Sequence, residues 1–235
     1  MQQGSKERDT VGLERVIFEA RFQNGYLYWD NCGKIWRTLT DIRPDLEMGQ
    51  VTTDQATLQI EGEGITISFS HQRFGIHQDY PKNLDVYKKF AGQSFNSVID
   101  NLKIEEFSRI GNRYQYIVKH NDRDEVTDFF KEKNIFTIPK RLIHPMNKIT
   151  EPHVKFTLER DNMSIIVQIG YFSRDLKATV QKPLKIDTSS FISKGISIDI
   201  DSASTNIIRR GTLDVAEFIA VQEKSVRRII DYILT

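Results

Sequence analysis

Two arginines interrupt a stretch of the chain that otherwise has the apolar pattern of a buried strand. Residues 107–120 read FSRIGNRYQYIVKH, which places Arg109, Gly111 and Arg113 among apolar neighbours. A guanidinium group presents several donors in one plane, so it binds carboxylates and phosphates well. Two interpretations are open: the arginines pair with carboxylates inside the fold, or they form the floor of an anion-binding or partner-binding groove.

The alternation of side chains along a strand separates this stretch into two faces. Arg109 and Arg113 share one face, whereas Tyr114 and Tyr116 share the other. Gly111 indicates a bulge or a close backbone approach at which a side chain would clash. The candidate ligand-binding or partner-binding residues are Arg109, Arg113, Tyr114 and Tyr116. If the arginines are structural, the carboxylates expected to pair with them are Glu105, Asp100 and Asp128.

A second pair of charged residues has a spacing that suits metal chemistry. Asp199 and Asp201 alternate with isoleucines in ISIDID, so both carboxylates leave one face of a strand and can share a divalent cation. Two ligands are only half of such a site, and the five histidines complete it in no recognised spacing. We therefore expect no metal here. The alternative is a solvated strand face whose charges limit edge pairing.

Other catalytic signatures are missing from the sequence. It contains no nucleophile elbow, glycine-rich phosphate loop, paired-cysteine motif or helical HExxH. We therefore expect no catalytic residues and no cofactor. Basic residues cluster only near the C-terminus, where a solvated helix face is expected and phosphate contact is the alternative. The weak candidates for nucleic-acid binding are Arg209, Arg210, Lys224, Arg227 and Arg228.

Two long amphipathic helices are predicted among the elements that position these residues. The first covers 83–102, with Asn83 as its N-cap and with Phe90 and Phe95 in its apolar stripe. The second covers 212–233. A shorter helix is predicted within the segment that ends at Ile42, where the apolar residues at helical spacing are Tyr26, Trp29, Cys32, Ile35, Trp36 and Leu39.

The order of elements predicts an α+β fold with two lobes, each an antiparallel sheet packed against a long amphipathic helix. Polar tips between alternating apolar residues predict β-hairpins at 56–74 and 153–172. We place an N-terminal lobe at 1–120 and a C-terminal lobe at 154–235, joined by a short helix and a proline-containing connection at 121–153. The two halves share an order of elements, so a duplicated unit is an alternative.

Composition limits the classes of partner. The 235 residues include 33 basic and 32 acidic side chains, so the formal charge of +1 gives no global attraction for nucleic acid or membrane. Cys32 is the single cysteine, which excludes an internal disulfide and suits a reducing compartment. The polar start MQQGSKERDT and the short apolar runs predict a cytoplasmic protein with no membrane partner.

The central segment 87–120 resembles the signature of a sporadically distributed bacterial family whose members have about this length. The matching residues of its R-I-G-x-R-Y strand motif are Arg109, Ile110, Gly111, Arg113 and Tyr114. The segments VIFEARF near the N-terminus and ISIDIDSAS near the C-terminus also fit the family pattern, so the resemblance covers most of the chain. This chain departs from the family at Gln115 and Tyr116, where members carry an asparagine soon after the tyrosine.

This resemblance implies a biological context for the protein but no chemical mechanism. The patchy occurrence of the family is similar to that of bacterial defence and toxin-antitoxin-like genes. The expected function is a non-enzymatic binding or regulatory protein in such a module, acting on another protein through a groove between the lobes. The alternative is a metal-dependent phosphoester-cleaving enzyme or a nucleic-acid binder that uses Asp199, Asp201 and the basic terminal helix.

Overall fold

The computed structural model describes residues 11–120, 123–135, 151–182 and 185–235, and for 175–182 and 185–192 it describes the backbone alone. The elements are β1 (Val11–Arg21), α1 (Tyr28–Ile42), β2 (Glu47–Val51), β3 (Gln55–Ile60), β4 (Ile65–Ser70), β5 (Arg73–Asp79), α2 (Leu84–Leu102), β6 (Glu106–Phe107), β7 (Arg109–His120), α3 (Arg123–Glu132), β8 (His153–Arg160), β9 (Met163–Lys182), β10 (Lys185–Ser204), β11 (Ile208–Arg209) and α4 (Val215–Leu234).

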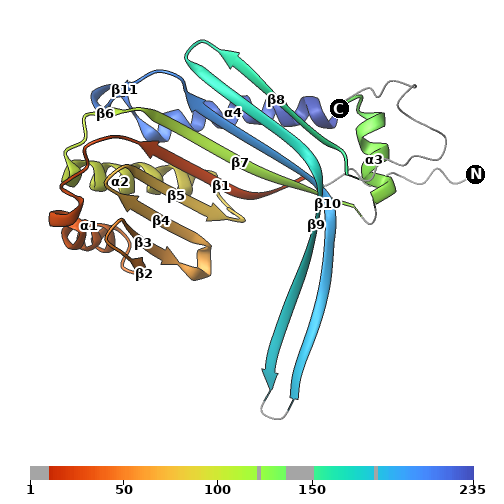
Figure 1. Ribbon diagram of the computed structural model, residues 1–235, viewed down its shortest axis with the longest axis horizontal. Coiled ribbons are helices and arrows are strands. Elements are labelled where there is room, and N and C mark those ends of the chain that lie inside the picture. The colour runs from red at the N-terminus through yellow and green to blue at the C-terminus, as the bar shows by residue number, and fades with distance from the viewer. Residues whose placement is uncertain (1–10, 121–122, 136–150, 183–184) are drawn as a thin grey trace, which may run out of the picture.

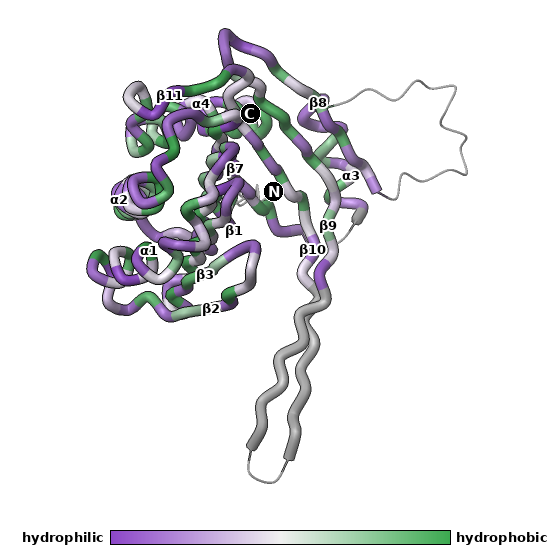
Figure 2. Tube along the Cα trace, turned by 60° about the vertical axis from the view of Figure 1, so that its left-hand side comes forward, coloured by the Kyte–Doolittle hydropathy of each residue, from purple (hydrophilic) through white to green (hydrophobic). Residues whose placement is uncertain are grey.

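In the described part of the chain, nine strands form one sheet in the order β2-β3-β4-β5-β1-β7-β10-β9-β8. Every neighbouring pair in this sheet is antiparallel. Helices α1, α2 and α4 lie on one side of the sheet (Figures 1 and 2). The α2 helix packs on β5 and on α4, and α4 packs on β7. The predicted α+β class with antiparallel pairing is confirmed.

The two long helices form where the sequence predicts them. The Asn83 side chain accepts a hydrogen bond from the Asp85 amide at 2.8 Å, so it is the N-cap of α2. Phe95 is buried, and its ring centroid lies 5.7 Å from that of Phe18 and 5.3 Å from that of Phe107. The apolar stripe of α2 is therefore part of the core of the sheet.

The polar residue Gln222 interrupts the buried apolar stripe of α4, and its contacts explain how the core accepts it. The Gln222 amide oxygen accepts a hydrogen bond from the Ser202 hydroxyl of β10 at 2.6 Å, so this oxygen is satisfied in the core. The neighbouring Glu223 is also buried, and the Lys88 ammonium of α2 lies 2.9 Å from its carboxylate. This ion pair joins the two helices across their contact.

The predicted division into two lobes, and with it a duplicated unit, is not confirmed. Strand β7 pairs with β1 on one edge and with β10 on the other, so strands of both halves belong to one sheet. Because β7 is paired on both sides, it has no open edge. The core-facing side chains of β7 and β10 form one apolar layer that contains Ile110, Val118 and Ile198. Most of the predicted connection, 136–150, lies outside the described residues.

The buried face of α1 differs from the predicted one. The helix buries Tyr28, Ile35 and Leu39. In contrast, Tyr26 and Trp29 expose 64% and 52% of their surface. Tyr26 precedes the first residue of the helix, so its apparent helical spacing from the later residues has no structural meaning.

Strands β9 and β10 form a hairpin that projects beyond the rest of the sheet (Figure 1). β10 pairs with β7 from Lys194 to Ala203, but with β9 along its whole length from Lys185. The paired segments 174–182 and 185–193 therefore contact each other without β7, and we call them the arm. The arm begins beside His120, at the end of β7, whereas Arg109 is the first residue of this strand and lies at its opposite end.

Candidate functional site

Arg109 crosses the face of β7 and bridges its two neighbouring strands. Its Nη1 donates to Oε1 of Glu19 on β1 at 2.9 Å, and its Nη2 donates to the two carboxylate oxygens of Asp201 on β10 at 2.7 and 2.9 Å. The side chains of Arg109, Glu19 and Asp201 expose 23%, 23% and 31% of their surface. This ion-pair bridge therefore joins three strands in partial shelter from water.

Gly111 makes room for this bridge. A Cβ at Gly111 would lie 2.9 Å from Nη1 and 3.0 Å from Cζ of Arg109, so the guanidinium lies over the glycine. The register of β7 with β1 and β10 runs through this position without a shift, so the bulge predicted as one alternative is absent at Gly111. The other predicted alternative was a close approach to Gly111. The structure shows such an approach, and the group that makes it is the Arg109 side chain of the same strand.

Arg113 makes a similar contact nearer to water. Its Nε donates to Asp199 at 2.8 and 3.0 Å, Nη2 also bonds this carboxylate, and the Gln115 amide donates to it at 3.3 Å. The hydrogen bonds to Asp199 raise the pKa of Arg113 above its ordinary value. The Arg113 side chain is 44% exposed. This ion pair therefore stabilises the fold less than the Arg109 bridge.

These contacts confirm the ion-pair interpretation of the arginines and correct their partners. The carboxylates are Glu19, Asp199 and Asp201, which lie on strands next to β7. Two predicted partners pair elsewhere, because Asp100 binds Arg210 and Asp128 binds Lys131. The third, Glu105, accepts the Arg210 amide through its backbone carbonyl at 2.8 Å. Sequence proximity suggested those residues, but strand order selects the partners.

The same contacts bear on the metal candidates. Asp199 and Asp201 both face guanidinium groups, so their negative charges are matched by protein cations. A divalent ion would have to displace these arginines to reach both carboxylates. Among the described residues, no group of three or more histidine, cysteine, aspartate or glutamate side chains is arranged to hold a metal.

The two tyrosines lie on the opposite face of the sheet from the arginines. Tyr114 is fully buried, and its hydroxyl donates to the Ile219 carbonyl of α4 at 3.2 Å. Tyr116 packs against the core beside it, and burial raises the pKa of its phenol to about 12. The structure thus brings Arg109 and Arg113 together with the two aspartates and separates them from both tyrosines.

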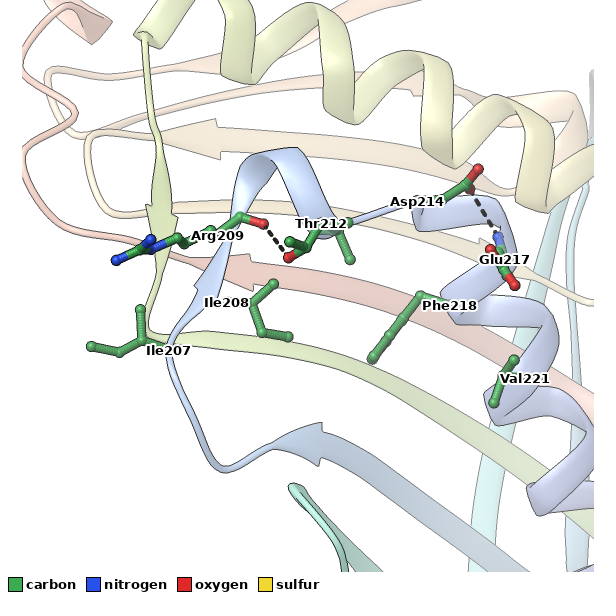
Figure 3. A pocket seen from close by; sticks show the side chains of 9 residues that line it. Ile207, Ile208, Arg209, Thr212, Asp214, Glu217, Phe218 and Val221 are labelled. Atoms are coloured by element: carbon green, nitrogen blue, oxygen red, sulfur yellow. Dashed lines mark hydrogen bonds between the residues drawn. The ribbon is translucent and has the colours of Figure 1, made fainter.

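Three of the five basic candidates near the C-terminus have acidic partners, which reduces their attraction for phosphate. The ion pairs are Arg209–Glu106, Arg210–Asp100 and Arg227–Glu223. Lys224 and Arg228 are exposed and have no ion pair with any residue that the structure describes. Arg209 also lines a surface cavity of about 530 Å³ beside the start of α4, together with Ile207, Phe218 and Val221 (Figure 3).

A cavity of about 440 Å³ lies at the base of the arm. We call it the arm-base groove. Its lining residues come from β1, β7, β9, β10 and the turn after β5, and they are Val11, Gly12, Leu13, Glu14, Tyr80, Ile117, Lys119, Phe172, Arg174 and Ser193. The groove therefore lies between the N-terminal strands and the C-terminal hairpin, and its lining includes neither Arg109 nor Arg113, the predicted floor of a binding groove.

A buried carboxylate holds the arm-base groove in shape. Glu14 is only 9% exposed, and it binds both terminal nitrogens of Arg174, one of them at 3.0 Å. The Tyr80 hydroxyl donates to the same carboxylate at 3.2 Å, and the Arg174 guanidinium lies 5.5 Å from the centroid of the Phe172 ring. The sequence signal was an acidic residue within an apolar strand segment. The register shift between Leu13 and Arg15, where Glu14 lies, is seen only in the structure.

Comparison of the chain with protein-family models gives no match, and comparison with curated proteins gives none either. No helix in the described ranges is both long enough and apolar enough to cross a bilayer.

Proposed function

We propose that this protein is a binding or regulatory protein without catalytic activity, and that it holds a segment of a partner protein in the arm-base groove. The observation that carries the proposal is the lining of this groove by both halves of the chain. A partner there would contact β1, β7 and the arm at once. Its binding would therefore change how the arm is held against the sheet.

The chemistry of the groove suits a protein partner. Ile117 and Phe172 supply apolar surface, while Lys119 and the Glu14–Arg174 ion pair supply charge beside it. An apolar centre with a polar rim is the usual anatomy of a protein interface. The ion pair is already satisfied within the chain, which leaves Lys119 as the charge available to an acidic group of the partner.

The biological setting is part of the same proposal. The run from Arg109 to Tyr114 supports membership of the sporadically distributed bacterial family, and that family suggests a cytoplasmic defence or toxin-antitoxin-like module. The first candidates for the partner are accordingly the products of neighbouring genes. The alternative, a metal-dependent phosphoester-cleaving enzyme, is disfavoured because Arg109 and Arg113 occupy the carboxylates that it would need.

Co-purification with the products of neighbouring genes tests this proposal. The informative variant is Lys119→Glu, because Lys119 is exposed and its charge can be reversed without disturbing the core. The matched control is Lys89→Glu, an exposed lysine on α2. We expect one gene product to bind the parent protein and the control in a fixed ratio and to be lost from Lys119→Glu. Equal recovery with Lys119→Glu would place the interface elsewhere.

A further inference from the structure

Three aromatic rings stack at the end of the sheet opposite the arm. The Trp29 ring lies 6.3 Å from Tyr26 and 5.4 Å from His71, measured between centroids, with interplanar angles of 19° and 21°. Tyr26 and Trp29 expose 64% and 52% of their surface. Exposed rings of this size bury apolar area readily when another planar group stacks on them.

Hydrogen bonds to backbone carbonyls hold the Trp29 ring and the turn that contains Gly25. The Trp29 indole donates to the Thr53 carbonyl at 3.0 Å, and the Gly25 amide donates to the His71 carbonyl at 3.0 Å. A Cβ at Gly25 would lie 2.5 Å from the same carbonyl oxygen, so only glycine allows this approach of the two turns. A preorganised surface loses little conformational freedom when it binds a ligand.

A row of arginines borders the stack. Arg73, Arg21 and Arg109 occupy opposed positions on the neighbouring strands β5, β1 and β7. Glu19 binds Arg21 at 2.8 Å and Arg109 at 2.9 Å, whereas Arg73 bonds the neutral amide of Gln55. No carboxylate in the described part of the chain pairs with Arg73, so this end of the row has an uncompensated positive charge.

A cavity of about 570 Å³ lies beside the stack, lined by Arg21, Tyr26, Trp29 and His71. Arg73 directly follows Gln72, which also lines the cavity. This volume is within the range of roughly 300–1,000 Å³ that small-molecule sites occupy. Phe22 and four polar residues complete its lining, and the polar residues are Gln23, Asn24, Gln72 and Ser108. Their amides and hydroxyl can donate and accept hydrogen bonds at the edge of a planar ring.

We propose that this cavity binds a nucleotide, with its base stacked on Tyr26 at the outer end of the stack and its phosphate on Arg21 and Arg73. Aromatic stacking accepts any base because every base has a π face. Arginine forks match the oxygens of a phosphate. The nucleotide is either free or an unpaired residue of a single strand. This site is separate from the arm-base groove, so each proposal can fail alone.

Tryptophan fluorescence provides the test. The chain has two tryptophans, so Trp36→Phe leaves Trp29 as the sole reporter within the cavity. We expect adenosine monophosphate to quench this signal saturably, adenosine to bind roughly tenfold more weakly, and inorganic phosphate alone to leave the signal unchanged. A single-stranded adenylate of about ten residues distinguishes the sources. Tighter, salt-dependent binding indicates a single strand, and equal affinity indicates the free nucleotide.

Variants in the Trp36→Phe background locate the binding. Tyr26→Ala should weaken it roughly tenfold by removing the stacking surface, whereas Tyr232→Ala, which changes an even more exposed tyrosine on α4, should not. Arg73→Gln should reduce the preference for the monophosphate over adenosine. Absence of saturable quenching by any nucleotide, or an unchanged affinity in Tyr26→Ala, would overturn the proposal.

Discussion

Replacing Arg109 by alanine tests the ion-pair bridge that joins β1, β7 and β10. The change removes three charge-assisted hydrogen bonds and leaves Glu19 and Asp201 without their shared partner. Exposed pairs contribute about 0–1 kcal/mol, and loss of one partner of a fully buried pair costs about 3–5 kcal/mol. The side chains here are roughly a quarter exposed. We therefore expect Arg109→Ala to lower the free energy of unfolding by about 2 kcal/mol.

Gly111 offers a second perturbation of the same contact. Alanine at this position would place a Cβ 2.9 Å from Nη1 of Arg109, so the guanidinium would have to move from its carboxylates. We expect Gly111→Ala alone to cost about 1 kcal/mol. In the Arg109→Ala background the obstructing atoms are gone, and alanine in a strand is favoured over glycine by about 0.5–1 kcal/mol. The double variant should therefore be no less stable than Arg109→Ala.

Urea unfolding of the four proteins measures the coupling between the two positions, with the m-value as a check on two-state behaviour. We expect a coupling energy of about 1–2 kcal/mol. The control cycle pairs Arg109→Ala with Gly33→Ala, because a Cβ at Gly33 meets no atom within 4 Å, and its two effects should add. If Gly111→Ala costs the same with and without Arg109, the guanidinium does not lie over the glycine in solution and this reasoning is wrong.

Further outcomes concern the core, the helix contact and the metal alternative. Phe95→Ala should lower the free energy of unfolding by about 3–5 kcal/mol, since its ring is buried among three others; a loss below about 1 kcal/mol in urea unfolding would contradict this packing. Burial raises the pKa of Glu223, but hydrogen bonds from Lys88 and Arg227 outweigh it and hold the pKa below its ordinary value of 4.5. The resulting stability is present above the unfolded-state pKa and is lost as pH falls through the folded-state pKa, so the advantage of the parent over Glu223→Gln should shrink on acidification below pH 4.5. Thermal unfolding of both proteins at neutral and acidic pH checks this, and a constant difference would refute it. Millimolar magnesium, manganese or calcium should leave the melting temperature unchanged, whereas a rise that Asp201→Asn abolishes would support the metal-dependent enzyme.

The sequence alone determined the elements whose signals are local. The apolar stripe of α2 and its cap at Asn83 are confirmed, because helix periodicity and capping depend on residues three or four positions apart. The hairpin of β3 and β4 and that of β8 and β9 are confirmed for the same reason, since adjacent strands with a polar tip pair across a short turn. Alternation also placed Arg109 and Tyr114 correctly on opposite faces of β7.

Only the tertiary structure decided which distant segments meet. The partners of Arg109 lie 90 and 92 residues away in the chain, and the order of strands that selects them has no local signal. For the same reason two predicted sheets are one sheet. Tyr26 and Trp29 are residue types that are common in cores. Only the structure shows that their rings are exposed and that Trp29 stacks on His71 of a neighbouring turn. Burial is a property of what packs against a side chain, and in a sheet those neighbours come from strands remote in sequence.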